Sequence, residues 1–409
     1  MPDELGVWLY GQRVAVIDRE RERLRLSYTD EALARYPLGT PLLSLSLPVA
    51  NRRYTQGVVR PFLDGLLPEG ESRTAIARDV GVSPGDTYGL IRALGRDCAG
   101  AIVIQPADDA PPRQPTTVSA EPLDDEALAA LVRDLRSAPL GAGGRVRISL
   151  PGVQEKLVLT RMPNGEWGRP IDGTPSTHIL KPEIAAFPDT VENEAFCMRL
   201  AAHLGLQVAT VATTAIGGRK VIVVERFDRQ VSADGAVERV HQEDFCQATG
   251  LPPETKYEED GGPSLRRIAG ILADVADPNS MERLLGAVTV NALIGNGDAH
   301  AKNFSLLHTA SGALALSPLY DLLSTLYYDD DRLAMYIDNV HRTNRVTAER
   351  IANEAASWGI ARERAAEIVD DLLTNAPGAI AQARDETPGV PADLIKTVER
   401  QLVQLRPRD

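Results

Sequence analysis

Hydrophobic and polar residues follow short, mixed patterns in the first hundred residues. Apolar runs at residues 14–17 and 24–28 flank a charged turn, which predicts a β-hairpin. Residues 72–80 carry apolar side chains at helical spacing, and residues 100–104 form an apolar run typical of a buried strand. Residues 64–71, with the sequence DGLLPEGE, are expected to form a turn. This part of the chain therefore predicts a small mixed subdomain of strands and helices.

A polar stretch separates this subdomain from the rest of the chain. Residues 105–122 are rich in Pro, Asp and Thr and poor in apolar side chains, so we expect a linker and the main domain boundary there. The N-terminal domain would then span residues 1–120. A helix is predicted for residues 124–136, and the basic, glycine-rich stretch 141–147 is expected to be a flexible loop.

Strand patterns come next, and helix patterns follow them. The strands are expected at residues 157–161, 177–180, 208–213 and 221–225, and the helices at 191–204, 265–275, 281–294 and 348–358. This order predicts an α+β fold with two lobes, like that of a protein kinase. A strand-rich nucleotide lobe would occupy residues 121–240, and an all-helical C-terminal lobe residues 241–409.

The composition excludes several classes of protein. The 409 residues carry a net charge of −13, whereas a chain that binds DNA by itself is expected to present a basic face. No apolar run approaches the roughly 20 residues of a membrane span, and the acidic N-terminus has no signal-peptide core, so we expect a cytoplasmic protein without membrane contact. The three cysteines are far apart, which predicts neither a disulfide framework nor a C-x-x-C metal site.

The segment Gly295–Asn303, with the sequence GNGDAHAKN, carries the first candidate chemistry. Asp298 and Asn303 have the D-x-x-x-x-N spacing of a kinase catalytic loop, placed here at residues 295–305. In such a loop the Asp accepts the proton of the substrate hydroxyl and the Asn holds Mg²⁺, while Lys302 could neutralise the transferring phosphoryl group. The same spacing also occurs in polar surface turns, so other residues must support the interpretation.

Asp321 is the one acidic residue of the apolar run 316–323. Residues 304–307 and 313–316, which precede it, predict a hairpin. A charge in apolar surroundings needs a partner or a metal, and a kinase places its second Mg²⁺ carboxylate after such a hairpin. The alternative is that Asp321 caps a helix that starts at Leu322.

A kinase site also needs a lysine for the phosphates and a helical glutamate that holds this lysine. Lys181 lies at the end of a predicted buried strand, and Glu194, on the helix predicted at 191–204, is the expected partner. Glu192 is expected to be solvated, because carboxylates are favoured in the first turn of a helix. The alternative for Lys181 is an ordinary exposed lysine at a strand end.

Two further segments fit a nucleotide site. The strand 221–225 leads into Glu225–Phe227, where a kinase hinge would offer backbone groups to adenine; the alternative is a core strand that ends in charged residues. Pro151–Lys156 has no P-loop pattern, but a glycine-containing turn can cover phosphates with backbone N–H groups. Ser149 lies beside this turn. Physical reasoning alone would make the segment an ordinary turn.

Taken together, these segments resemble the HipA family, the serine kinase toxins of type II toxin–antitoxin systems. The matching motifs are RISLPGVQEK (147–156), THILK (177–181), ERFDR (225–229), QEDFCQ (242–247), KYEEDGGP (256–263), GNGDAHAKNFS (295–305) and PLYD (318–321). The match runs over nearly the whole chain, with weaker motifs in the N-terminal domain. The resemblance implies a serine/threonine kinase that uses ATP and Mg²⁺.

The resemblance also implies a role for each matching residue. Asp298 would be the catalytic base, Asn303 and Asp321 the Mg²⁺ ligands, and Ser149 an autophosphorylation site whose modification ejects the covering loop and inactivates the kinase. The nucleotide would be held by Pro151, Gly152, Val153, Gln154, Glu155, Lys156, Lys181, Glu225, Arg226, Phe227, His300, Ala301, Lys302, Asn303, Tyr320 and Asp321. Pro151 is a departure that stiffens the start of the loop, because Pro fixes φ.

Partners follow from the same resemblance. They are a dimeric, HipB-like helix-turn-helix antitoxin, operator DNA reached through that antitoxin, and an aminoacyl-tRNA synthetase, such as the glutamyl enzyme, as the substrate. Phosphorylation of the synthetase would inhibit translation and lead to growth arrest and persistence. Two other classes stay open: a catalytically silent homologue that acts as a co-repressor, and a small-molecule phosphotransferase on a similar scaffold.

Overall fold

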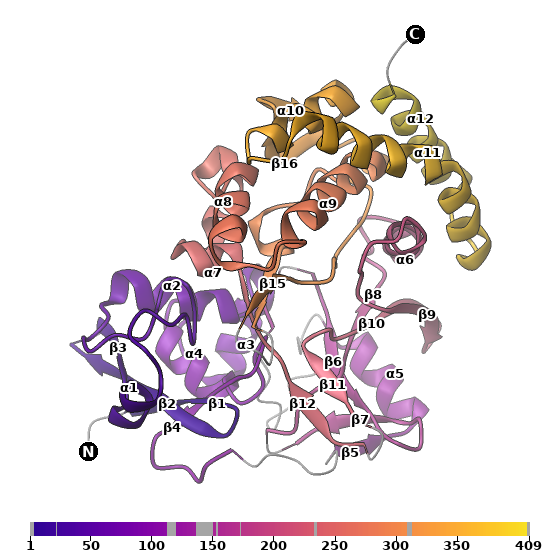
Figure 1. Cartoon of the computed structure of the whole chain (residues 1–409). Coiled ribbons are helices and arrows are strands. Elements are labelled where there is room, and N and C mark those ends of the chain that lie inside the picture. The colour runs from indigo at the N-terminus through magenta and orange to yellow at the C-terminus, as the bar shows by residue number, and fades with distance from the viewer. Residues whose placement is uncertain are drawn as a thin grey trace. The chain divides into compact units, whose positions relative to one another are not determined.

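The chain forms two compact units, between which it passes several times (Figure 1). The computed structural model describes residues 4–21, 23–112, 120–135, 150–152, 154–171, 173–232, 235–308 and 313–406. The first unit comprises Met1–Pro182, Ala215–Arg219 and Glu225–Glu254, and the second comprises Glu183–Thr214, Lys220–Val224 and Thr255–Asp409. The division into domains at residues 120 and 240 stays a prediction.

An antiparallel sheet in the order β3–β2–β1–β4 begins the first unit. Helices α2 and α4 pack against it, and their side chains, such as Phe62 and Ile91, share its buried apolar core. The hairpin and the helix predicted at 72–80 are confirmed. The elements are β1 (Glu4–Leu9), β2 (Gln12–Glu20), β3 (Arg23–Tyr28), α1 (Asp30–Arg35), α2 (Gln56–Leu66), α3 (Gly70–Val80), α4 (Thr87–Leu94) and β4 (Ile102–Pro106).

The turn predicted at residues 64–71 is wrong at both ends, because α2 continues to Leu66 and α3 begins at Gly70. The Asp64 carboxylate is buried and accepts hydrogen bonds from Arg73 at 2.8 Å and Thr87 at 2.7 Å. Arg60, one helical turn earlier, donates to it at 3.2 Å. A buried acid with three donors is stable inside a helix. These partners come from other elements, so local polarity suggested a turn instead.

A second antiparallel set of strands in the first unit has the order β5–β7–β6–β8. The strands predicted at 157–161 and 177–180 are confirmed as β6 and β8, and both ends of the linker predicted at 105–122 belong to strands. The elements are β5 (Ala120–Leu123), α5 (Asp125–Arg133), β6 (Leu157–Arg161), β7 (Trp167–Pro170), β8 (His178–Pro182), β11 (Arg229–Val231), β12 (Val237–Arg239), β13 (His241–Asp244) and α7 (Phe245–Thr249). Strands β9 (Val211–Ile216) and β10 (Arg219–Glu225) contain residues of both units.

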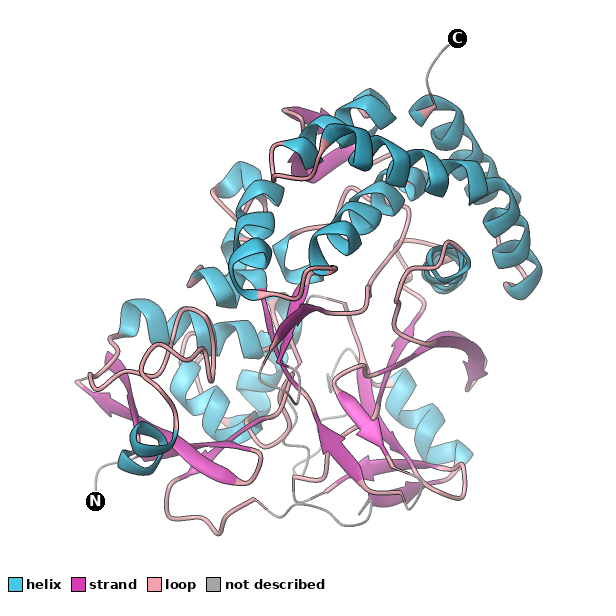
Figure 2. Cartoon of the chain, viewed as in Figure 1, coloured by secondary structure: helices cyan, strands magenta, loops and turns pink. Residues whose placement is uncertain are grey.

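Helices dominate the second unit and surround α9, which is buried at every residue from Leu284 to Ile294 (Figure 2). A helix that is apolar on all sides needs such cover. The predicted helical character of the C-terminal region is confirmed, but the region is not all-helical, because two hairpins interrupt it, one of them the hairpin expected at 304–316. The elements are α6 (Thr190–His203), α8 (Leu265–Val275), α9 (Ser280–Ile294), β14 (Ser305–His308), β15 (Leu314–Leu316), β16 (Arg332–Ile337), β17 (Val340–Arg342), α10 (Ala348–Ala356), α11 (Arg362–Glu386) and α12 (Ala392–Leu405).

Short 3₁₀ turns connect several of these elements: η1 (Pro253–Thr255), η2 (Glu258–Asp260), η3 (Ala301–Asn303), η4 (Leu326–Tyr328) and η5 (Thr343–Arg345). All three cysteines are buried as free thiols. Within the described part of the chain, no helix combines the length and the apolarity that a membrane crossing requires.

Candidate active site

The buried helix α9 delivers the predicted catalytic loop. Gly295 ends the helix in the left-handed conformation, at φ 67°, a common use of glycine. The Asn296 N–H then donates to the carbonyl of Asn291 at 2.9 Å, and the two asparagine side chains bond to each other at 2.8 Å. The start of the loop is therefore fixed to the helix by both main-chain and side-chain bonds.

Gly297 is clamped by the segment that leads into β16. Its N–H donates to Oγ1 of Thr325 at 2.8 Å, and its carbonyl accepts from Ala334 at 2.7 Å. A Cβ at this position would lie 2.1 Å from the carbonyl oxygen of Arg332, which is far inside contact distance. The loop can approach this segment so closely because residue 297 has no side chain.

Asp298 is held at both its main chain and its carboxylate. Its N–H donates to Oδ1 of Asn296 at 3.0 Å, and its own Oδ1 accepts a bond of 2.7 Å from the Tyr257 hydroxyl. Burial raises the pKa of Asp298 above its ordinary value, and the nearby charges of Asp321 and Asp330 raise it further, whereas Tyr257 and Lys256 oppose the rise. A carboxylate with a raised pKa is suited to act as a general base.

Asn303 returns to the same aspartate. Its Nδ2 donates to the main-chain carbonyl of Asp298 at 3.2 Å, and its N–H donates to the carbonyl of His300 at 2.9 Å. The D-x-x-x-x-N spacing therefore closes a short loop around η3. The side-chain amide nitrogen is used in this bond, which makes the amide oxygen the atom suited to hold a cation.

Tyr320 and Asp321 lie beside this loop. The Tyr320 hydroxyl donates to the carbonyl of Lys302 at 2.7 Å and lies 2.7 Å from the Ser305 hydroxyl. Asp321 adopts a left-handed backbone with φ 58°, and its charge acts on Asp298. No helix begins at Leu322, so the helix-cap alternative for Asp321 is wrong.

His300 is buried in the loop as a neutral imidazole. Burial, followed by the positive charge of Lys256, lowers its pKa to about 3. Its ring packs edge to face against Tyr257, with the centroids 5.3 Å apart. Its Nδ1 is buried and has no hydrogen-bond partner among the described residues, which is costly unless a ligand supplies one.

Tyr257 and Lys256 are site residues for which the sequence predicted no role. Both belong to the KYEEDGGP segment, 41 positions before Asp298 in the case of Tyr257. The ammonium of Lys256 lies 5.5 Å from the centroid of the Tyr257 ring, and its carbonyl accepts from the N–H of Ala301 at 3.3 Å. This segment resembles a motif of the family, and that resemblance could have indicated a role in the site. The spacing of its residues does not indicate a contact with Asp298.

The other predicted residues are divided between the two units. Lys181 is buried at the end of β8, as expected, and Glu194 is buried on α6. Their pairing stays a prediction. Gly152 has φ 111°, and Lys156 closes the turn by donating to the carbonyl of Pro151; Gln154 and Glu155 are partly exposed in this turn. Ser149, Val153 and the stretch 141–147 lie outside the described residues.

The side chain of Arg226 is part of a buried ionic cluster in the first unit. Arg226 bonds both oxygens of Asp228, at 2.9 and 2.8 Å, and Arg229 bonds Asp97 at 2.9 Å. Burial alone would raise the pKa of Asp228, but the two guanidinium charges hold it below its ordinary value. With Arg239, these residues form what we call the Arg226 cluster. The Arg226 side chain is therefore not available to adenine. If Glu225–Phe227 bind adenine, they would do so with backbone groups, as the hinge hypothesis requires.

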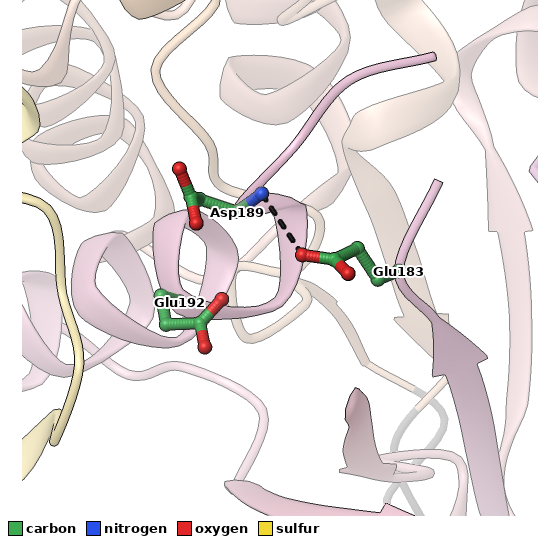
Figure 3. Close-up of side chains that lie close together, drawn as sticks. All are labelled: Glu183, Asp189 and Glu192. Carbon is green, nitrogen blue, oxygen red and sulfur yellow. Dashed lines mark hydrogen bonds between the residues drawn. The ribbon is translucent and has the colours of Figure 1, made fainter. Parts of the chain in front are cut away.

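Three carboxylates that could hold a metal lie elsewhere in the second unit: Glu183, Asp189 and Glu192 (Figure 3). The Lys220 ammonium lies 2.8 Å from Glu192 and within 4 Å of the other two. Lys220 therefore already supplies the cation for this group. The expectation that Glu192 is solvated is wrong: it is 7% exposed, because Lys220 compensates its charge.

The fold is of the protein-kinase-like type, and comparison with known proteins places it more narrowly. The family model "HipA-like C-terminal domain" matches residues 148–380, and "HipA N-terminal domain" matches residues 5–105. The chain belongs to the HipA family.

Individual relatives cover nearly the whole chain. The Y4mE protein of Sinorhizobium fredii is 39% identical over 94% of this chain and 92% of its own length. The serine/threonine-protein kinase toxin HipA of Shewanella oneidensis is 33% identical over 87% of this chain and 84% of its own. The structure of the Shewanella oneidensis HipA, HipB and operator DNA complex contains a chain that matches with a TM-score of 0.82 and 30% identity, over 98% of this chain and 95% of that one.

Proposed function

We propose that this protein is an ATP-dependent serine/threonine kinase with Asp298 as its catalytic base. The observation that carries the proposal is the geometry of the loop: Tyr257 orients the Asp298 carboxylate at 2.7 Å, and Asn303 bonds to the carbonyl of the same residue at 3.2 Å. Tyr257 occupies Oδ1, which leaves Oδ2 to accept the proton of the substrate hydroxyl. Membership of a family that includes a serine/threonine kinase toxin supports the same reaction.

The residues present fit Mg²⁺ and ATP. The Asn303 amide oxygen and the Asp321 carboxylate are hard oxygen ligands of the kind that Mg²⁺ prefers. The buried Nδ1 of His300, which has no hydrogen-bond partner in the part of the chain that the structure describes, is suited to a nucleotide atom. Lys181 would bind phosphates, Pro151–Lys156 would cover them, and the Glu225–Phe227 main chain would hold adenine. When bound, Mg²⁺ and ATP supply the phosphoryl group and neutralise its charge.

We further propose that the kinase is the toxin of a toxin–antitoxin pair. Its partner would be a HipB-like antitoxin that also binds operator DNA, because the Shewanella oneidensis relative forms a complex with HipB and its operator DNA. The substrate would be an aminoacyl-tRNA synthetase, whose phosphorylation would arrest translation. Phosphorylation of Ser149 would add about two negative charges beside an arginine-rich segment and silence the enzyme.

Phosphate incorporation with purified protein and radiolabelled Mg-ATP tests the reaction. The wild type is expected to label itself at Ser149, and Asp298→Asn, which keeps an acceptor for Tyr257, is expected to lose the label. Asp371→Asn, an exposed acid on α11, is the matched control. Equal labelling of the wild type and Asp298→Asn would refute the assigned base. Phosphoproteomics after induction of both proteins would then identify the substrate, and a phosphorylated small molecule in place of a protein would favour the small-molecule phosphotransferase.

A further inference from the structure

Three aromatic side chains gather at the surface of the second unit. Phe187 is 49% exposed, and its ring centroid lies 5.4 Å from that of Tyr328, which is in turn 5.0 Å from Tyr327. The Tyr328 hydroxyl donates to the carbonyl of Pro188 at 2.9 Å, and that of Tyr327 donates to Asp189 at 3.1 Å. These bonds join the loop before α6 to η4, so the aromatic rings form one preassembled surface.

Both segments that carry these rings also carry carboxylates. On the α6 side lies the group drawn in Figure 3, and on the η4 side the acids that follow Tyr328. Lys220 is shared by the three carboxylates on the α6 side, Arg332 pairs with Asp330 and Arg342 pairs with Asp331, so the six carboxylates outnumber these cations. The group therefore keeps a net negative charge. We call its exposed and half-exposed members the aromatic–acidic patch: Phe187, Tyr327, Tyr328, Glu183, Asp189, Asp329, Asp330 and Asp331.

This patch is continuous with the segment that holds the catalytic loop. Thr325, directly before η4, accepts from the N–H of Gly297 at 2.8 Å, and Ala334, shortly after the acids, donates to the carbonyl of Gly297 at 2.7 Å. Gly297 precedes the candidate base. Asp330 is close enough for its charge to act on Asp298. A ligand on the patch would therefore lie near the hydroxyl that is to be phosphorylated.

We propose that the aromatic–acidic patch docks an arginine- and lysine-rich segment of the protein substrate, beside the serine or threonine that accepts phosphate. This inference rests on the proposed kinase function. Guanidinium groups stack on the faces of Tyr and Phe and also pair with carboxylates, so one side chain can use both features of the patch. Nucleic acid is not the occupant, because its phosphates would be repelled by the carboxylates.

Steady-state phosphorylation of a synthetic peptide tests the proposal. The probe is a peptide with one serine flanked by four arginines, compared with the same peptide in which alanine replaces each arginine. The double variant Phe187→Ala/Asp329→Asn removes an exposed ring and a charge. Asn is tolerated at position 329, where φ is 64°. Asp371→Asn is again the control for a lost surface charge.

For the arginine peptide, we expect the double variant to raise KM about tenfold, as lost cation–π and ion-pair contacts predict, with kcat and autophosphorylation unchanged. Raised salt should remove the difference between the two proteins. An unchanged KM, or no preference of the wild type for the arginine peptide, would overturn the docking proposal. Binding of the arginine peptide can be measured separately with a fluorescein label. If the wild type binds this peptide but phosphorylates neither the peptide nor itself, the proposed kinase function is contradicted and the docking proposal is not.

Discussion

Tyr257 and Asp298 are joined by a hydrogen bond of 2.7 Å between the tyrosine hydroxyl and one carboxylate oxygen. The bond fixes the rotamer of the candidate base and favours its charged form. Burial has the opposite effect on Asp298, whose pKa is raised on balance. The tyrosine therefore keeps a partly buried base available for proton transfer.

Replacing Tyr257 by Phe should make the base harder to ionise. Without the donated bond, the pKa of Asp298 rises further, so the acid limb of the pH profile of kcat/KM is expected to move to higher pH. The limb should move by about 0.4–1.1 pH units, which corresponds to the loss of a hydrogen bond of ~0.5–1.5 kcal/mol at 1.36 kcal/mol per unit. Tyr336→Phe, whose ring packs on His341, is the control. A uniform loss across all pH values would contradict the pKa argument.

The contact of Gly297 with Arg332 predicts the effect of a single methyl group. Gly297→Ala would place Cβ 2.1 Å from a carbonyl oxygen, so the loop must shift. We expect loss of phosphate transfer and a free energy of unfolding lower by about 1–3 kcal/mol. Gly270→Ala, on the exposed face of α8 with no atom within 4 Å, should instead stabilise the protein by ~0.5–1 kcal/mol. Urea unfolding of both variants measures the contrast, and similar stabilities would contradict it.

Removing one cation from the Arg226 cluster should be costly. Arg226→Met leaves Asp228 buried without its bidentate partner, and a broken buried pair typically costs about 3–5 kcal/mol. The expected result is a much lower unfolding temperature by calorimetry. Arg364→Met, which removes an exposed pair with Glu282, should change that temperature little. If both variants melt alike, the cluster does not stabilise the first unit as inferred.

Glu243 makes the folded protein less stable as the pH rises, which is the opposite of the usual effect of a paired carboxylate. Burial raises its pKa from 4.5 to about 7, while bonds from Ser44 and the Leu45 N–H oppose the rise. The folded protein therefore binds the proton more tightly than the unfolded chain, so this contribution to stability is lost as the pH rises from about 4.5 to 7. Glu243→Gln should flatten this slope and add roughly 3 kcal/mol at pH 8, at 1.36 kcal/mol per unit.

Chemical denaturation at a series of pH values measures this effect. Glu363→Gln, an exposed acid in the first turn of α11, should keep the slope of the wild type. Parallel curves for Glu243→Gln and the wild type would show that Glu243 is ionised in the folded protein throughout the range.

The sequence was most informative where the chemistry lies in a contiguous segment. The loop from Asp298 to Asn303 is such a segment: its spacing predicted that these residues act together, although not the bond that Asn303 donates to the carbonyl of Asp298. Strands β6 and β8 were also predicted, because the apolar runs that indicate them are local. Partners that come from distant positions could not be predicted in this way. The contact between Tyr257 and Asp298 and the contact between Lys220 and Glu192 form only when the chain folds.

The Arg226 cluster connects segments that match two different family models. Asp228 accepts from the N–H of Gly100 at 2.7 Å, and Arg226 donates to the carbonyl of Cys98 at 2.9 Å. Residues 5–105 match one model and residues 148–380 the other. The buried acids and arginines of these two segments neutralise one another. If one segment were replaced by the corresponding segment of a distant relative, a buried charge would lose its partner unless the acids and arginines were exchanged together. Recombination between family members should therefore preserve this set of residues as a unit.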